Sequence, residues 1–345
     1  MISMNFKIFL FFTVITGTSL AQTGGTTGFN FLNLPFNARV TGLGGSFITA
    51  RDLDVNLGIQ NPALLNSEMH KRGSISQTLL AGGINSGQLN YAYSFANNIT
   101  GAAHFRYVSY GKMKRTDING TDLGTFSPGD FILGASAGKS INERMHIGAT
   151  FNIIYSQLDQ YIAFGNSLDI GGCYTNEERR VVLSGVVKNL GIQWKGYNET
   201  RSSLPLEIQM GISHKLKHAP FRFSLLGQHL QKWDLTYNDP NAKETVDALT
   251  GEVIPLNKAG FGEKLARHFV VQTEILFGKK LHLRIGFDYN RRQELKLTQR
   301  PGISGFSFGA GMYFKRFSVD YGFMSYSAAG MQHALSISIP LGGAK

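Results

Sequence analysis

The sequence predicts a transmembrane β-barrel of fourteen antiparallel strands, preceded by a separate N-terminal segment. The first observation is alternation: in 145–156, Met145, Ile147 and Ala149 share one phase, and His146 lies on the other. A period of two places alternate side chains on opposite faces of a strand. The second observation is that short and long gaps between such segments alternate along the chain. Strands joined by short turns at one end and longer loops at the other are typical of outer-membrane barrels.

The N-terminus has the pattern of a secretory signal peptide. Lys7 precedes the apolar run 8–15, and Ser19-Leu20-Ala21 has the small-x-small form of a cleavage site. The apolar run is too short to span a bilayer. We therefore expect residues 1–21 to be removed after Ala21; a buried helix or an uncleaved anchor is the alternative.

The composition agrees with a barrel at a lipid surface. No other stretch approaches the ~20 consecutive apolar residues of a transmembrane helix, and a chain without one can span lipid only as a closed barrel. Glycine and aromatic residues are abundant (41 Gly, 25 Phe, 13 Tyr), as expected for tilted strands with aromatic girdles. The net charge of +11 favours contacts with outer-membrane lipid headgroups, and no basic motif supports nucleic acid. Cys173 is the only cysteine, so no intrachain disulfide forms, and we interpret it as a small packing residue.

Residues 72–345 are assigned to the barrel. Its expected strands cover 73–80, 88–95, 99–110, 130–139, 145–156, 166–174, 181–190, 204–214, 220–230, 267–277, 281–289, 303–314, 317–324 and 332–341. On these bounds every gap at one end is shorter than every gap at the other. The short gaps are therefore predicted to be periplasmic, together with both termini, and the protein is predicted to be integral to the outer membrane.

Residues 22–71 do not have the strand pattern and are predicted to fold into the lumen as a hatch or plug. The segment is rich in glycine but carries apolar residues such as Phe29 and Phe31, which argue against a disordered tail. In its Asn61-Pro62-Ala63 motif, Asn61 is placed to cap a helix that begins at Pro62.

No combination of residues predicts catalysis, a metal site or a cofactor. His214 and His218 straddle a strand end and a turn, which excludes a helical zinc pair. The candidates His229, Asp234 and Glu274 lack any pattern that links them as nucleophile, base and orienter. Three further groups have plain structural interpretations. They are Asp117–Asp122 as a turn at Asn119-Gly120 rather than a calcium loop; Gly309-Ala310-Gly311 as close packing within a strand; and Tyr91, Tyr93, Phe105, Tyr107, Phe287, Tyr289, Phe306, Phe308 and Tyr321 as a lipid-facing girdle.

Several short motifs, in order, resemble those of one family. They are Asn30–Leu34 with Asn37-Ala38-Arg39, Leu43-Gly44-Gly45, Asp52 and Asp54, Asn61-Pro62-Ala63, Lys188-Asn189-Leu190-Gly191, Leu204-Pro205 with Gly211, and Gly305–Gly311 with Val319-Asp320-Tyr321. Over the whole mature chain the sequence resembles PorQ-type proteins, relatives of PorV in the superfamily of the FadL fatty-acid transporter. The resemblance implies a fourteen-stranded barrel with an N-terminal hatch that is not an enzyme. It also implies a role in the type IX secretion system of Bacteroidota, beside a PorV-like barrel, a sortase-like protease and a large surface protein.

Two functions follow from these observations. The first is a component of the secretion and attachment machinery that docks partners through extracellular loops; the alternative is a FadL-like transporter of hydrophobic small molecules. The longest gap, 231–266, is the expected docking surface because it carries interface-type residues. These candidates are Trp233, Leu235, Tyr237, Val246, Leu249, Ile254 and Leu256. The same residues would be buried if the loop formed a lid, and 111–129 is the next candidate for docking.

Overall fold

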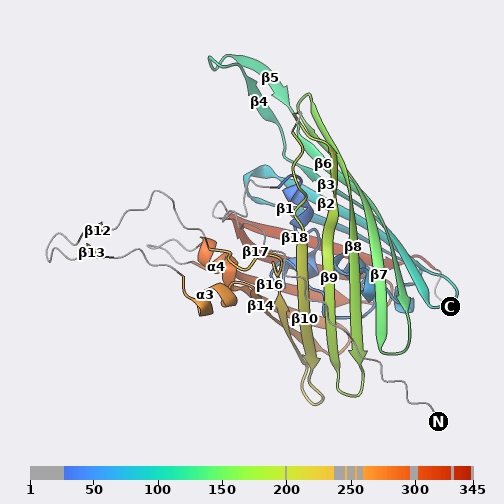
Figure 1. Ribbon diagram of the computed structural model, residues 1–345. Coiled ribbons are helices and arrows are strands. Elements are labelled where there is room, and N and C mark those ends of the chain that lie inside the picture. Colours follow the sequence, from blue (N-terminus) through green and yellow to red (C-terminus); the bar gives the residue numbers. More distant parts are fainter. Residues whose placement is uncertain are drawn as a thin grey trace, which may run out of the picture.

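The computed structural model describes residues 27–198, 200–236, 245–246, 253–254, 259–295, 302–327 and 330–342. Fourteen strands form one closed barrel (Figure 1). They are β1 (Arg72–Leu79), β2 (Asn85–Ser94), β3 (Ile99–Ser109), β6 (Gly129–Ser140), β7 (Met145–Leu158), β8 (Tyr161–Asn176), β9 (Val181–Lys195), β10 (Glu207–Lys215), β11 (Phe221–Gly227), β14 (Phe269–Phe277), β15 (Leu281–Asp288), β16 (Phe306–Tyr313), β17 (Ser318–Ser327) and β18 (Gly330–Pro340). The prediction of a fourteen-stranded antiparallel barrel is confirmed.

Each barrel strand pairs antiparallel with the next along the chain, and β18 closes the barrel against β1. In this closing pair Arg72 lies opposite Pro340 and Leu79 lies opposite His333. Both chain ends of the barrel therefore lie at the end that also carries the connections 95–98, 141–144, 177–180, 216–220, 278–280 and 314–317. We call this the turn end, and the opposite end of the barrel the loop end.

The predicted sorting of the gaps is only partly correct. Four long connections, 110–128, 196–206, 228–268 and 289–305, do lie at the loop end. However, β7 and β8 continue until only residues 159 and 160 separate them, and the β1–β2 connection is only 80–84. The expected loop 157–165 is wrong because polar residues near the barrel rim remain in the strands. The claim that every gap at this end exceeds every gap at the other is therefore wrong.

The strands present apolar side chains outward and mainly polar ones inward. In β6, Phe131 and Leu133 are exposed, whereas Asp130 and Ser136 are buried. Tyr91, as predicted for the outer girdle, is also exposed. Among the described residues, no helix is long and apolar enough to cross a membrane. The outer face is the apolar surface that lipid requires of a spanning barrel.

Two smaller hairpins and the helices complete the described secondary structure. The hairpin of β4 (Met113–Thr116) and β5 (Asp122–Phe126) projects beyond the barrel at the loop end (Figure 1). Gly120 has a φ of +82° in its turn, as expected for the Asn119-Gly120 pair. The other elements are β12 (Thr245–Val246), β13 (Val253–Ile254), α1 (Ala38–Thr41), α2 (Leu57–Gln60), α3 (Phe261–Ala266), α4 (Tyr289–Leu295), and the 3₁₀ turns η1 (Asn30–Asn33), η2 (Pro62–Leu64), η3 (Ser67–Met69) and η4 (Ala81–Gly83).

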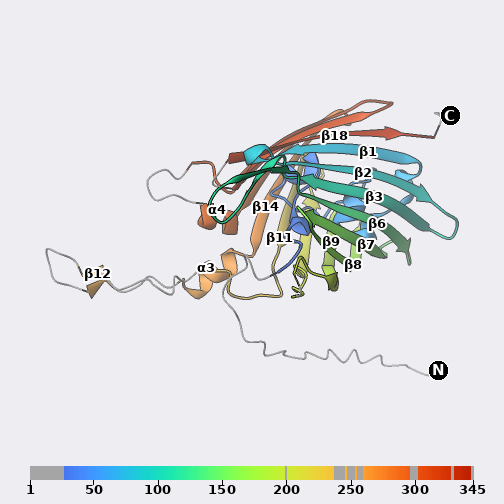
Figure 2. The same cartoon turned by 90° about the horizontal axis from the view of Figure 1, so that it is seen from above.

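Residues 27–71, which we call the N-terminal segment, lie inside the ring of strands (Figure 2). The segment packs against opposite sides of the wall, with α1 against β16–β18 and η2 against β6–β8. Phe36, Leu43, Phe47 and Leu64 are fully or almost fully buried there. Cys173 faces the same interior and packs with the cluster around Leu43, as predicted for a small packing residue.

Candidate functional site

Helix α1 is placed against the barrel wall by a capping asparagine and by glycines. The Asn37 side chain accepts a hydrogen bond from the Val40 amide at 3.0 Å, and the Ala38 amide donates to Ser336 Oγ at 2.9 Å. Gly322 of β17 allows the approach, because a Cβ there would lie 2.1 Å from the Ala38 carbonyl oxygen. Gly309, from the predicted close-packing motif, similarly faces Gly42.

This placement brings Arg39 into the lumen, where three carboxylates hold its guanidinium. Nη1 and Nη2 donate to the two Asp52 oxygens at 3.0 and 2.8 Å, and Nη1 also donates to Asp54 at 3.3 Å. From the wall, Glu274 of β14 accepts from Nε at 3.1 Å and from Nη2 at 3.2 Å. The guanidinium also lies 5.2 Å from the centre of the Phe47 ring. One side chain of α1 therefore ties the N-terminal segment to β14 of the wall.

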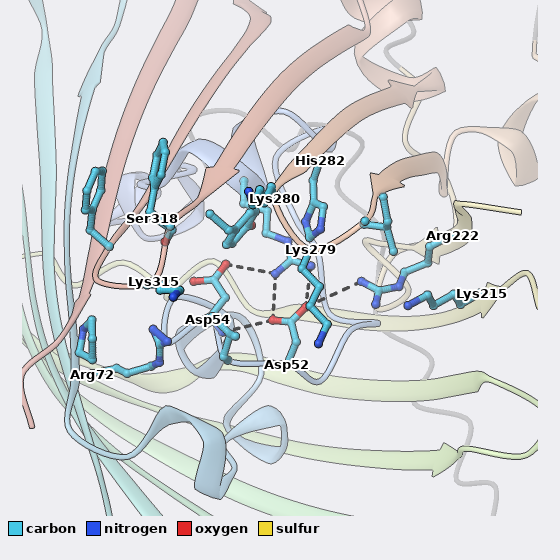
Figure 3. A pocket seen from close by; sticks show the side chains of 18 residues that line it. Asp52, Asp54, Arg72, Lys215, Arg222, Lys279, Lys280, His282, Lys315 and Ser318 are labelled. Carbon is cyan, nitrogen blue, oxygen red and sulfur yellow. Dashed lines mark hydrogen bonds and ion pairs between the residues drawn. The ribbon is translucent and has the colours of Figure 1, made fainter. Parts of the chain in front are cut away.

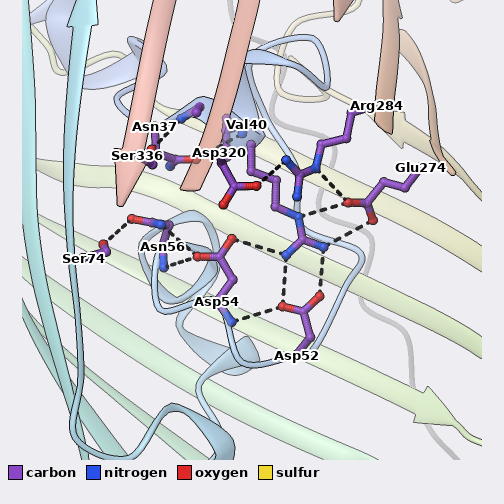
Figure 4. Close-up of polar contacts among 12 residues, drawn as sticks. Asn37, Val40, Asp52, Asp54, Asn56, Ser74, Glu274, Arg284, Asp320 and Ser336 are labelled. Carbon is purple, nitrogen blue, oxygen red and sulfur yellow. Dashed lines mark hydrogen bonds and ion pairs between the residues drawn. The ribbon is translucent and has the colours of Figure 1, made fainter. Parts of the chain in front are cut away.

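A second layer of charge in the wall surrounds Glu274 (Figure 4). Arg284, which is completely buried, donates from Nε to Glu274 at 3.2 Å and from Nη1 to Asp320 at 2.5 Å. Arg222 donates to the other Glu274 oxygen at 2.6 Å. We call the set Arg39, Asp52, Asp54, Arg222, Glu274, Arg284 and Asp320 the charge network.

The charge network contains three guanidinium groups and four carboxylates. Burial by itself raises the pKa of Asp52, but the adjacent Arg39 outweighs it and the pKa is lowered. For Asp54, burial dominates over Arg39 and the pKa is raised. Asp54 is therefore the more readily protonated of these two carboxyl groups. A buried network of this kind is costly to break, because removing one partner leaves unpaired charge in the interior.

Two asparagines fasten the rest of the N-terminal segment. Asn56 Oδ1 accepts from Ser74 Oγ at 2.7 Å and from Asn90 Nδ2 at 2.6 Å, on β1 and β2. Asn61 Nδ2 donates to Ser184 Oγ of β9 at 2.7 Å. As the motif predicts, the Asn61 side chain caps a helical turn that begins at Pro62, although the turn is a short 3₁₀ helix. The Asn61-Pro62-Ala63 motif therefore serves attachment of the segment to the wall.

Below the charge network, the lumen opens at the turn end into a cavity of about 710 Å³ (Figure 3). We call it the turn-end vestibule. Asp52, which is 31% exposed, and Arg222 form part of its boundary with the charge network. Most of the rest of its lining consists of cations from the strand ends and turns, together with apolar groups. These residues are Arg72, Lys215, Lys279, Lys280 and Lys315, with Leu53, Leu276, Phe314, Phe317 and Pro340.

At the loop end the lumen has a different lining. Val108, Ile132, Ile154 and Ala163 face inward near the ends of β3, β6, β7 and β8, where a solvated lumen would carry polar residues. Phe29, Phe31, Leu32 and Phe36 of the N-terminal segment fill the space between them, together with Leu204. We call this set the loop-end apolar cluster.

The predicted docking residues are only partly within the described structure. Trp233 is 50% exposed and its ring contacts Phe261 and His268, whereas Leu235 is buried. Val246 pairs with Val253 in the backbone of the small β12–β13 hairpin, where Ile254 also lies. Tyr237, Leu249 and Leu256 lie outside the described residues. The described contacts of Trp233 and Leu235 agree with partial folding of this loop onto its own neighbours.

The three residues considered for catalysis have different partners. Glu274 belongs to the charge network, His229 Nδ1 lies 2.6 Å from Glu207 Oε2, and Asp234 forms an ion pair with Lys264 at 2.7 Å. Among the described residues, no group of three or more His, Cys, Asp or Glu side chains is arranged to hold a metal. The charge network attaches the N-terminal segment to the wall, and the turn-end vestibule beside it is lined by cations.

The charge network was not predicted from the sequence. Its wall members, Arg222, Glu274 and Arg284, are charged residues within otherwise apolar or polar strands, which is a detectable signal. The N-terminal segment carries Arg39, Asp52 and Asp54, whose charges are complementary to those of the wall residues. Their pairing joins residues 235 positions apart, as in Arg39 and Glu274, and the strand pattern alone does not specify it.

Comparison with known proteins shows which fold the chain shares, but it shows no closer relationship. No protein-family profile matches the sequence, and no curated protein matches it. Among solved structures, the CymD monoaromatic hydrocarbon channel is similar with a TM-score of 0.53 and 13% identity, covering 89% of this chain and 98% of that chain. The toluene transporter TodX of Pseudomonas putida gives 0.52 and 12%, covering 88% and 98%. A Pseudomonas aeruginosa FadL homologue gives 0.48 and 11%, covering 89% and 98%. The chain therefore shares the barrel fold of CymD and TodX.

Proposed function

We propose that this protein is a non-enzymatic barrel of the outer membrane that admits hydrophobic small molecules past its N-terminal segment. The observation that carries the proposal is the loop-end apolar cluster. Inward-facing Val108, Ile132 and Ile154 give the lumen an apolar wall at one end, and aromatic side chains of the N-terminal segment cover it. An apolar solute can replace such side chains because its transfer from water to this wall is favourable.

The fold supports the same proposal. TodX and CymD are named as a toluene transporter and a monoaromatic hydrocarbon channel, and their barrels are similar to this one over most of both chains. In this proposal the turn end, where β18 ends, faces the periplasm. The first described residue, Thr27, instead pairs with Ser203 in the loop-end connection 196–206, so the expectation that both termini lie at the turn end does not hold for the start of the N-terminal segment. The signal peptide expected over residues 1–21 supports export.

Uptake by whole cells tests the proposal. The chain is expressed in a Gram-negative host that lacks its own hydrophobic-solute channel, and uptake of a labelled monoaromatic hydrocarbon and a labelled long-chain fatty acid is measured. We expect saturable uptake, and a reduced rate in the Val108→Thr/Ile154→Thr double variant, which places hydroxyl groups in the apolar wall. Thr100→Val, on the same face of β3 nearer the turn end, is the control. Uptake equal to that of cells without the chain contradicts the proposal.

A second candidate function, docking within the type IX secretion system, is favoured by the projecting β4–β5 hairpin. Every residue of β4 is exposed, and Ile118 at the tip is completely exposed. An isolated two-stranded hairpin is only marginally stable in water, so a partner that covers it would stabilise it. The partners that the PorQ resemblance implies, namely a PorV-like barrel, a sortase-like protease and a large surface protein, belong to this candidate.

The two candidate functions separate on loop deletion in the native host. Replacing 112–127 or 240–258 by a Gly-Ser link leaves the barrel strands intact. Docking predicts that one of these deletions releases surface proteins into the medium while solute uptake is unchanged. Retention of all surface proteins by both deletion variants contradicts docking through these loops.

A further inference from the structure

Beyond uptake or loop docking, we propose that the turn-end vestibule binds an acidic peptide segment of a partner protein. The cavity, about 710 Å³, is in the size range of sites that enclose a ligand rather than of a surface dimple. It lies inside the ring of strands, with Arg72, Lys215, Lys279 and Lys315 around it (Figure 3). Because they line an interior cavity, these cations differ from basic residues that face only the outside of the barrel.

The cations of the vestibule are not neutralised within the described part of the protein. Arg72, Lys215, Lys279, Lys280 and Lys315 form no ion pair with any described residue. The nearby carboxylates are already engaged, since Asp52 and Asp54 bind Arg39. Five unpaired cations around one cavity create a positive potential that attracts an anionic occupant.

The positions of these cations favour an occupant with several separated negative charges. Arg72 begins β1, Lys215 ends β10, Lys279 and Lys280 form the β14–β15 turn, and Lys315 lies in the β16–β17 turn. One carboxylate or phosphate contacts only a neighbouring pair of such groups. An extended peptide with acidic residues at intervals reaches cations on several strand ends, and each pair adds a small favourable term.

The apolar part of the lining favours a peptide over a purely ionic polymer. Phe314 and Phe317 stack at 4.6 Å between ring centroids in the β16–β17 turn and remain 53% and 42% exposed. Leu53 and Leu276 add aliphatic surface. Exposed aromatic and aliphatic groups beside cations match a peptide that carries apolar as well as acidic side chains.

We assign the occupant to a partner molecule because the acidic residues that line the vestibule, Asp52 and Asp54, are already paired with Arg39. In the connection 177–180, Glu178 forms an ion pair with Arg144 of a neighbouring turn at 3.8 Å. Charge complementarity is therefore supplied from outside the chain.

Binding of synthetic peptides to the full chain in zwitterionic lipid nanodiscs tests the proposal. The probe is a fluorescent peptide with Glu at alternate positions and two Phe residues; one control peptide has Gln for Glu, and another has Ser for Phe. We expect saturable binding of the first peptide by fluorescence anisotropy, and weaker binding of both controls. The Lys279→Gln/Lys280→Gln variant should weaken binding about tenfold, since two exposed charge pairs contribute about 1.4 kcal/mol together.

A matched variant distinguishes binding in the vestibule from non-specific attraction of the peptide to the positive charge of the protein. Lys112→Gln/Lys114→Gln removes two exposed lysines at the loop end and should leave the affinity within about twofold, because it removes no vestibule contact. Equal loss in both variants would overturn the proposal, as would equal binding of the Gln peptide. Tighter binding of inorganic polyphosphate or of a small aryl sulfonate than of the acidic peptide would also overturn it, by showing a site for simple anions.

Discussion

The two ends of the N-terminal segment are held in the lumen by different chemistry. At the loop end, Phe29, Phe31 and Phe36 pack on apolar wall residues, whereas towards the turn end Arg39 is held by Asp52, Asp54 and Glu274. Apolar contacts are non-directional and tolerate small displacements, but a buried ion network requires each partner to stay in place. We therefore expect the loop-end part to be the easier to displace and the charge network to anchor the segment.

The largest expected effect comes from removing the central guanidinium. Arg39→Leu leaves Asp52, Asp54 and Glu274 without their shared partner, and loss of one member of a buried pair costs about 3–5 kcal/mol. Backbone hydrogen exchange in residues 37–60, measured by mass spectrometry, should become much faster. Arg72→Leu is the control, since Arg72 lines the vestibule without a described ion pair. Unchanged exchange in Arg39→Leu would mean that the charge network is not the anchor.

The next effect tests the loop end. Phe31→Ala removes a buried ring from the loop-end apolar cluster and should cost about 3 kcal/mol. Hydrogen exchange should rise in residues 29–36 but little in 37–60, because the charge network is untouched. Phe95→Ala, which removes an exposed outward ring, is the control. An equal rise over both stretches would show that the segment is released as one unit and that the comparison of its two ends is wrong.

A smaller effect is expected at the contact between α1 and the wall. Gly322→Ala places a Cβ 2.1 Å from the Ala38 carbonyl oxygen, and overpacking of this kind costs about 1–3 kcal/mol. Gly172→Ala is a matched control within a barrel strand, because a Cβ there meets nothing within 4 Å. Thermal unfolding and exchange at 38–41 should distinguish the two variants. Equal behaviour would contradict the close approach of α1 to β17.

The smallest effect is a pH dependence at the loop end. Burial alone would lower the pKa of His229, but its hydrogen bond to the Glu207 carboxylate outweighs burial and the pKa is raised above its usual 6.5. Protonated His229 therefore stabilises this connection fully below that usual value, and the contribution is lost as pH rises through the raised pKa. Proteolysis near 229–236 should increase from about pH 6 to about pH 9. His229→Gln should remove this dependence; if the dependence persists in the variant, another group causes it.

The barrel could be predicted from the sequence because the alternation of apolar and polar residues within each strand shows which side chains face outward and which face inward. Alternation in 145–156 identifies β7, and Cys173 packs in a buried cluster as the small residue that was predicted. The extension of β7 and β8 towards residues 159 and 160 was missed because solvated strand residues at a barrel rim have the composition of a loop.

The candidate site was less accessible to sequence reasoning. Strand phase shows that Glu274 and Arg284 face inward, but their partners come from a segment that enters the lumen from the far end of the sequence. The vestibule was hidden for the same reason, since Lys215, Lys279 and Lys315 are ordinary turn lysines until the barrel closes and places them around one cavity.

We expect the N-terminal segment, anchored by the charge network, to close the lumen. Planar-bilayer conductance of the intact protein and of a variant lacking residues 27–66 tests it most directly, after heat-modifiable migration in dodecyl sulfate has shown that both are folded. We predict little steady conductance for the intact protein and a large, stable conductance for the deletion variant. Equal conductance of the two folded proteins would contradict the claim.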